Sequence, residues 1–117
     1  MARFAFVKDA DGGVGMEILA DDVTSVFDAA GTALCRYVCD PAGVEEQDTF
    51  TVSAVGFNEK TTLVAVLSEL LFRIDTDRIA LRRFSLQTLE PVPANESGGR
   101  RQLRAVGTAF GEPFAEQ

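Results

Sequence analysis

The feature that most constrains this chain is one apolar stripe within residues 61–84, TTLVAVLSELLFRIDTDRIALRRF. Thr61 or Thr62 is suited to cap a helix there, since a threonine hydroxyl can accept a hydrogen bond from a free backbone N–H. Asp75-Thr76-Asp77 has the composition of a turn, and Arg78 to Leu89 that of a strand. A helix whose apolar face leads directly into a strand indicates a layered α+β domain. The stripe has the i, i+3, i+4, i+7 spacing of an amphipathic helix and comprises Leu63, Val66, Leu67, Leu70, Leu71 and Ile74.

A second amphipathic helix is predicted after Asp21 or Asp22, either of which can cap its first turn. Gly31 lies in the middle of this helix, where glycine costs up to about 1 kcal/mol relative to alanine, so we expect close packing against a neighbour. Asp40-Pro41-Ala42-Gly43 ends the helix because proline and glycine both oppose its continuation. Its apolar side comprises Val23, Val26, Phe27, Ala30, Leu34, Tyr37 and Val38.

Alternating apolar and polar residues predict four further strands, at Phe4–Val7, Val14–Ile18, Thr49–Val55 and Leu103–Phe110. Along residues 78–89 the apolar phase switches, which requires a bulge near Arg82-Arg83 because a strand alternates with period two. The order is ββ-α-β-α-ββ. We therefore predict a single α+β domain over residues 1–117, with two helices packed on a mostly antiparallel sheet.

Composition excludes several classes of function. The net charge of −7 argues against a general nucleic-acid-binding protein, which needs a basic field to displace counterions from phosphates. The absence of histidine excludes histidine-based catalysis and histidine-ligated zinc. Cys35 and Cys39, one helical turn apart, are interpreted as reduced buried thiols of a cytoplasmic protein rather than a redox or metal pair. No apolar run is long enough to span a membrane, and the N-terminus is too soon charged for a signal peptide.

Four short motifs follow one another along the chain: VTSVFDAAGTAL at Val23–Leu34, Val38-Cys39-Asp40, VLSELLFRIDT at Val66–Thr76, and Gly111-Glu112-Pro113-Phe114, reached through Leu103-Arg104-Ala105. In this order and spacing they resemble the archease family, and the resemblance covers most of the chain. The Gly-Glu-Pro-Phe step after a Leu-Arg-Ala strand is the most specific of them. The resemblance implies the archease α+β fold.

The family resemblance also implies where a metal site would lie. Archeases open with a His-Thr-Ala-Asp-Val-Gly signature whose aspartate helps to hold a divalent cation. The corresponding residues here are Ala10-Asp11-Gly12-Gly13-Val14-Gly15, so Ala10 stands at the histidine position and Gly13 at the aspartate position. The family's C-terminal acidic residue has no counterpart in the sequence up to Gln117.

Three aspartates remain as candidate metal ligands. Asp40 matches a second acidic position of the family, and Asp11, with Asp9 as a further candidate, lies in a glycine-rich turn that bends freely. Calcium and magnesium both prefer several oxygen ligands. We therefore predict a weak divalent-metal site at Asp11 and Asp40. The alternative is that Asp9 and Asp11 only form the turn and Asp40 only follows the helix.

A second candidate site consists of arginines expected on two paired strands. Arginine suits carboxylate and phosphate recognition through its planar fork of donors. We take Arg82, Arg83 and Arg101 as candidate partner-binding residues, and a solvated outer sheet face is the alternative. The expected basic patch comprises Arg82, Arg83, Arg100, Arg101 and Arg104.

Asp75-Thr76-Asp77 lacks the twelve-residue frame of a calcium loop, so a tight turn is favoured there.

The resemblance implies an accessory protein that promotes guanylylation of an RtcB-type RNA ligase in tRNA splicing or RNA repair. No nucleophile and base stand together in the sequence, so we do not expect an enzyme. The alternative is a binding or oligomerisation module that kept the fold, lost the metal site and pairs through an open sheet edge. A hydrolase using paired carboxylates is the least favoured alternative, because nothing places an acid beside a base.

Overall fold

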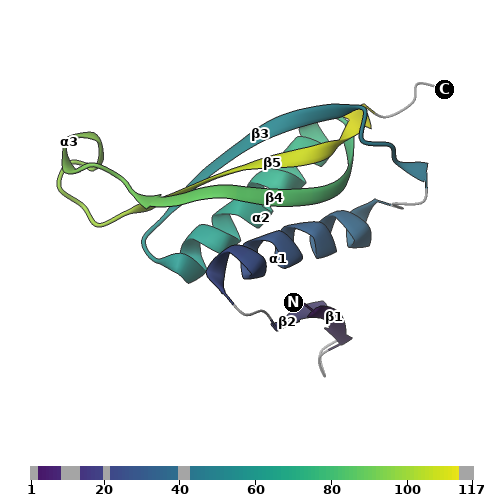
Figure 1. Ribbon diagram of the computed structural model, residues 1–117, viewed down its shortest axis with the longest axis horizontal. Helices are drawn as coiled ribbons and strands as arrows, with labels where there is room; N and C mark the ends of the chain where they lie inside the picture. Colours follow the sequence, from purple (N-terminus) through teal and green to yellow (C-terminus); the bar gives the residue numbers. More distant parts are fainter. Residues whose placement is uncertain (1–2, 9–13, 20–21, 40–42, 114–117) are drawn as a thin grey trace.

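The structure, a computed structural model, describes residues 3–8, 14–19, 22–39 and 43–113 (Figure 1). The elements follow one another in the order expected from the sequence, with one additional short helix. They are β1 (Arg3–Lys8), β2 (Val14–Leu19), α1 (Val23–Val38), β3 (Asp48–Gly56), α2 (Glu59–Thr76), β4 (Ile79–Pro91), α3 (Ala94–Ser97) and β5 (Leu103–Pro113).

The main sheet has three strands in the order β3-β5-β4, and both pairings are antiparallel. The last strand in sequence, β5, therefore lies in the middle, and β3 and β4 form the two edges. Helices α1 and α2 cover the same face of this sheet, α1 against β4 and α2 mainly against β3 (Figure 1). The predicted α+β fold is confirmed. Strands β1 and β2 pair in a separate sheet, which contacts α1 on its side away from the main sheet.

Helix α2 begins two residues before the predicted cap. Asn58 is the N-cap, and its side chain accepts a hydrogen bond from the Thr61 N–H at 2.9 Å while the Thr61 hydroxyl accepts one from the Asn58 N–H at 3.0 Å. Thr61 is thus the third helical residue of a capping box rather than the cap itself. Thr62 is fully buried, and its hydroxyl donates to the Asn58 carbonyl at 2.6 Å.

The buried side of α2 follows a slanted row of residues four apart: Thr62, Val66, Leu70 and Ile74. Residues four apart advance slightly more than one turn, so this row winds around the helix as it crosses the sheet. Leu71 was predicted to be buried but is 44% exposed, because it lies beside this row on the solvent side. None of the helices in the described ranges is both long and apolar enough to cross a membrane.

Helix α1 is capped by Asp22, whose carboxylate accepts a hydrogen bond from the Ser25 N–H at 2.7 Å, as predicted. Its middle is packed tightly between the main sheet and the β1–β2 hairpin. A Cβ atom on Gly31 would lie 2.7 Å from the Cβ of Phe84, and one on Gly107 would lie 2.4 Å from the far end of the same ring. The close packing predicted at Gly31 is confirmed. Tyr37, predicted on the apolar side, is 57% exposed in the last turn, so that prediction was wrong.

Strand β4 contains the predicted bulge. The pairing with β5 shifts between Leu81 and Arg83, so that Arg82 is the extra residue, and a second shift lies between Leu86 and Thr88. The bulge keeps Leu81 and Phe84 both buried against the helices despite their odd spacing. Asp75-Thr76-Asp77 is not a separate turn, because Asp75 and Thr76 are still helical and Asp77 is the C-cap of α2.

Candidate functional site

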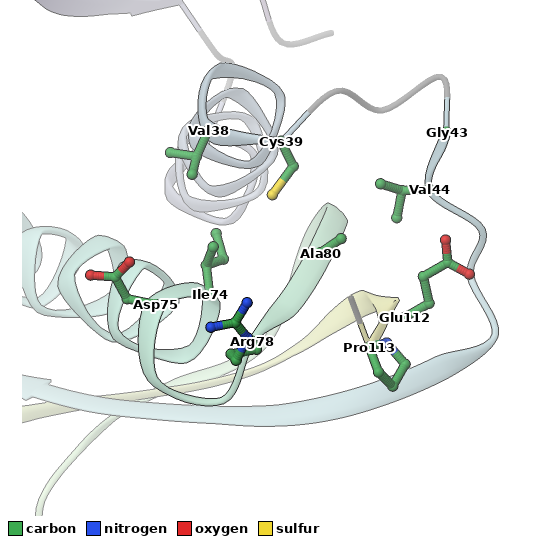
Figure 2. A pocket seen from close by; sticks show the side chains of 10 residues that line it. All are labelled: Val38, Cys39, Gly43, Val44, Ile74, Asp75, Arg78, Ala80, Glu112 and Pro113. Atoms are coloured by element: carbon green, nitrogen blue, oxygen red, sulfur yellow. The ribbon is translucent and has the colours of Figure 1, made fainter. Parts of the chain in front are cut away.

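A cleft of about 670 Å³ opens where α1 and α2 both end, beside the first residues of β4 and the last residues of β5 (Figure 2). Its size falls in the usual range of small-ligand sites. Its walls are polar and apolar in nearly equal parts, and three ionisable side chains with unlike charges border them. The lining residues are Val38, Cys39, Gly43, Val44, Ile74, Asp75, Arg78, Ala80, Glu112 and Pro113.

The three ionisable residues reach the cleft from different elements. Asp75 lies in the last turn of α2, and Arg78 follows the C-cap of that helix directly. Glu112 lies on β5 directly opposite Ala80 of β4 in the antiparallel register. None of these three forms an ion pair with another described residue. The described part of the cleft thus offers two carboxylates and one guanidinium that no partner within it neutralises.

The cysteines lie at the end of α1. The Cys39 N–H caps the helix by donating to the Cys35 carbonyl at 2.8 Å, and its sulfur points into the cleft (Figure 2). Both thiols are free and buried, as predicted. Burial, and then the neighbouring Cys39, raises the pKa of Cys35 to about 12. The Cys35 thiol therefore stays protonated near neutral pH, which disfavours a role as a nucleophile.

The predicted metal ligands Asp9, Asp11 and Asp40 lie outside the described residues. Cys39 and Gly43, the described residues on either side of residues 40–42, both line the cleft. Within the described ranges, no three cysteine, aspartate or glutamate side chains gather as they would around a metal ion. Two carboxylates beside an arginine do not fit a hard cation by themselves. The metal site at Asp11 and Asp40 therefore stays a prediction.

Arg82 and Arg83 lie at the bulge of β4 and are both held by Glu46. The Arg83 guanidinium contacts the two carboxylate oxygens of Glu46 at 2.9–3.1 Å and lies 3.6 Å from the centre of the Phe110 ring. Arg82 donates to the Val44 carbonyl at 3.3 Å. The hydrogen bonds from Arg83, and then the charges of both arginines, lower the pKa of Glu46. These two arginines therefore fasten the segment before β3 to the sheet.

Arg101 lies at the other end of the sheet. It lines a second, largely apolar groove with Phe57, Lys60 and Leu103. Along strand β5, Phe110, the partner of Arg83, lies six steps beyond Arg104, which corresponds to roughly 20 Å. Arg82 and Arg83 therefore do not form one basic patch with Arg101. The single patch was a wrong prediction, because the antiparallel register places the arginines at opposite ends. Their roles in partner binding stay predictions.

The chain matches one protein family over nearly its whole length. The model of the archease protein family (MTH1598/TM1083) matches residues 5–117. The chain belongs to the archease family. A solved structure, the solution structure of Methanobacterium thermoautotrophicum protein 1598, superimposes on this archease-family chain with a TM-score of 0.69. It is 24% identical in sequence, and the match covers 97% of this chain and 75% of that one, which shows a shared fold. No curated protein sequence matches significantly.

Sequence reasoning did not assign the described residues of the cleft to a site. Glu112, which lines the cleft, belongs to the Gly-Glu-Pro-Phe motif of the archease resemblance, so that motif could have indicated it as a site residue. Asp75 was interpreted as a turn residue, although the preceding helix carries it to the cleft. Nothing in the sequence pattern singled out Arg78, whose place depends on the backbone conformation after α2.

Proposed function

We propose that this protein is an accessory protein that promotes guanylylation and turnover of an RtcB-type RNA ligase in tRNA splicing or RNA repair. Membership of the archease family supports this proposal. The observation that carries it is the cleft at the ends of α1 and α2. It carries three ionisable groups that have no ion-pair partner among the described residues, and it adjoins the chain position at which Asp40 resembles an acidic site residue of the family.

We infer that the protein assists catalysis and does not itself catalyse the reaction. It contains no histidine, and the raised pKa of Cys35 keeps that thiol protonated. The acidic net charge of −7 disfavours direct general binding to RNA. We therefore expect the ligase protein to be the partner, in the cytoplasm, rather than its RNA substrate.

This proposal includes a divalent cation, calcium or magnesium, only as an ion that Asp40 and Asp11 would bind weakly. The described carboxylates that border the cleft are Glu112 and Asp75, and Arg78 beside them opposes a positive charge there. Because the described residues do not make a metal site by themselves, the proposal requires only that the cleft contact the ligase.

The test is the transfer of labelled guanylate from GTP to a cognate RtcB-type ligase, measured with and without this protein. We expect the wild-type protein to raise the fraction of guanylylated ligase. The variant Val38→Asp, which adds a carboxylate to the rim of the cleft, should lose this effect about 5-fold or more, a loss typical of a contact worth roughly 1 kcal/mol. Val55→Asp, the same substitution at a similarly exposed valine of β3 outside the cleft, is the matched control. No rise with the wild-type protein contradicts the proposal.

One observation favours the oligomerisation module as a second candidate. Helix α2 exposes Val64, Leu71 and Phe72 by 56%, 44% and 55%, and these residues share one side of the helix. The sheet also has two edge strands, β3 and β4. Light scattering at high protein concentration decides between the candidates. A stable dimer that Phe72→Ser abolishes would support the module, and a strict monomer would exclude it.

A further inference from the structure

Arg78 has a backbone conformation that is unusual for its residue type. It directly follows Asp77, the C-cap of α2, whose N–H donates to the Arg73 carbonyl at 3.0 Å. Its φ of 55° lies in the left-handed region, where glycine is favoured at the end of a helix because a Cβ atom is crowded there. The other positive-φ residues in the described ranges are Gly98 and Gly99. An arginine therefore occupies a position whose backbone conformation favours glycine.

The side chain of Arg78 is exposed and borders the cleft. Its guanidinium points into the cleft between Ile74 and Ala80 (Figure 2). It forms no ion pair with a described residue, although Asp75 and Glu112 border the same cleft. By contrast, Arg73, Arg83 and Arg104 each hold a carboxylate at about 3 Å, with closest contacts of 3.0, 2.9 and 2.9 Å. A strained backbone thus presents an unneutralised guanidinium to a cleft.

The surroundings of Arg78 select the charge of a ligand. A guanidinium offers a planar fork of donors that matches the two oxygens of a carboxylate or a phosphate. Asp75 and Glu112 both repel an anion, and they repel a doubly charged phosphate more strongly than a singly charged carboxylate. The apolar walls around Ile74 and Val44 suit the methylene groups that carry an acidic side chain.

We propose that Arg78 is the receptor for one carboxylate side chain, aspartate or glutamate, that a partner protein inserts into this cleft. The inference rests on the proposed function in one respect, namely that the ligase is the partner. The pairing of Arg78 with a carboxylate depends only on the cleft. A titration with a small probe therefore tests it without the ligase.

The probe is N-acetyl-Val-Glu-Val-amide, with the matched peptide N-acetyl-Val-Gln-Val-amide and inorganic phosphate added separately at constant ionic strength. The readout is the NMR signal of the Arg78 side-chain Nε–H group and of the backbone amides of Cys39, Ala80 and Glu112. We expect the glutamate peptide to shift these signals and to bind at least 10-fold more tightly than the glutamine peptide. Equal binding of both peptides, stronger binding of phosphate or the absence of any shift would each overturn the proposal.

The variant Arg78→Gly removes the guanidinium and leaves a residue that accepts the left-handed conformation. Its melting temperature should therefore stay equal to that of the wild type or rise, while binding of the glutamate peptide is lost. Arg100→Gly is the matched control, because it removes an exposed arginine that lines neither cleft and has no ion pair with a described residue. Peptide binding that survives in Arg78→Gly overturns the proposal.

The same two variants separate this proposal from the proposed function. If the wild-type protein stimulates guanylylation, Arg78→Gly should lose the stimulation and Arg100→Gly should keep it. Retained stimulation in Arg78→Gly contradicts a role of Arg78 towards the ligase. If the wild-type protein does not stimulate the ligase, the proposed function fails, and the peptide titration alone decides whether Arg78 binds a carboxylate.

Discussion

The contact between Gly31 and Phe84 provides a quantitative test of the packing of α1 on the sheet. In the variant Gly31→Ala, the new Cβ atom would lie 2.7 Å from both the Cβ and the Cδ2 of Phe84. Carbon atoms in favourable contact are roughly 3.5–4.0 Å apart, so the overlap is about 1 Å. Alanine in place of glycine would favour the helix by about 1 kcal/mol, whereas forcing an extra carbon into a packed core costs roughly 1–3 kcal/mol.

The net expectation for Gly31→Ala is a loss of about 1 kcal/mol in the free energy of unfolding. That loss corresponds to a melting temperature roughly 4–8 °C lower for a domain near this size. Urea unfolding followed by circular dichroism at 222 nm measures the free energy. Gly43→Ala is the matched control, since no atom lies within 4 Å of its new Cβ and its backbone φ is not positive.

A double-mutant cycle separates the overlap from the change in helix propensity. The background Phe84→Leu removes the ring and its Cδ2 contact but keeps the Cβ contact. Gly31→Ala should therefore cost less there than in the wild type without becoming stabilising, so the two substitutions should not be additive. The reasoning is refuted if Gly31→Ala stabilises the protein by the full helix propensity gain and its effect is the same in both backgrounds.

Two further predictions concern the charged groups. Arg83 lowers the folded-state pKa of Glu46 below its ordinary value of 4.5, so this carboxylate contributes stability above that pH and loses the contribution as the pH falls through its folded pKa. Glu46→Gln should therefore lower the melting temperature more at pH 7 than at pH 3, and an equal effect at both values contradicts the assigned pairing. Calcium, magnesium or manganese at about 100 times its Kd should stabilise the protein by about 2.7 kcal/mol if Asp40 binds it. The resulting thermal shift should vanish in Asp40→Ala and persist in Asp48→Ala, and no shift at millimolar metal excludes the site.

Much of the architecture could be predicted from the periodicity of the apolar residues. Both long helices, the cap at Asp22 and the bulge at Arg82 follow from spacing and local chemistry. The errors arose where tertiary structure decides burial. Leu71 and Tyr37 fit a helical stripe, but the slanted contact row of α2 and the exposed last turn of α1 leave both outside the core.

The candidate site was harder to predict because it is assembled from the ends of four elements. Glu112 and Ala80 are neighbours only through the register of β4 and β5, and Arg78 reaches the cleft through one left-handed residue. The prediction of a single basic patch was wrong for the same reason. The sequence does not show that Arg104 pairs with Glu90, near the end of β4 that lies far from Arg82 and Arg83. Local chemistry was predictable, and the long-range register was not.

The central claim is that this protein assists an RtcB-type ligase through the cleft at the ends of α1 and α2. Multiple-turnover ligation of an RNA substrate by a cognate ligase tests it most directly, with this protein present below the ligase concentration. The account predicts more ligation cycles per ligase with the wild-type protein and with Val55→Asp, and fewer with Val38→Asp and with Arg78→Gly. If the wild-type protein gives no increase even at a concentration equal to that of the ligase, the claim is contradicted.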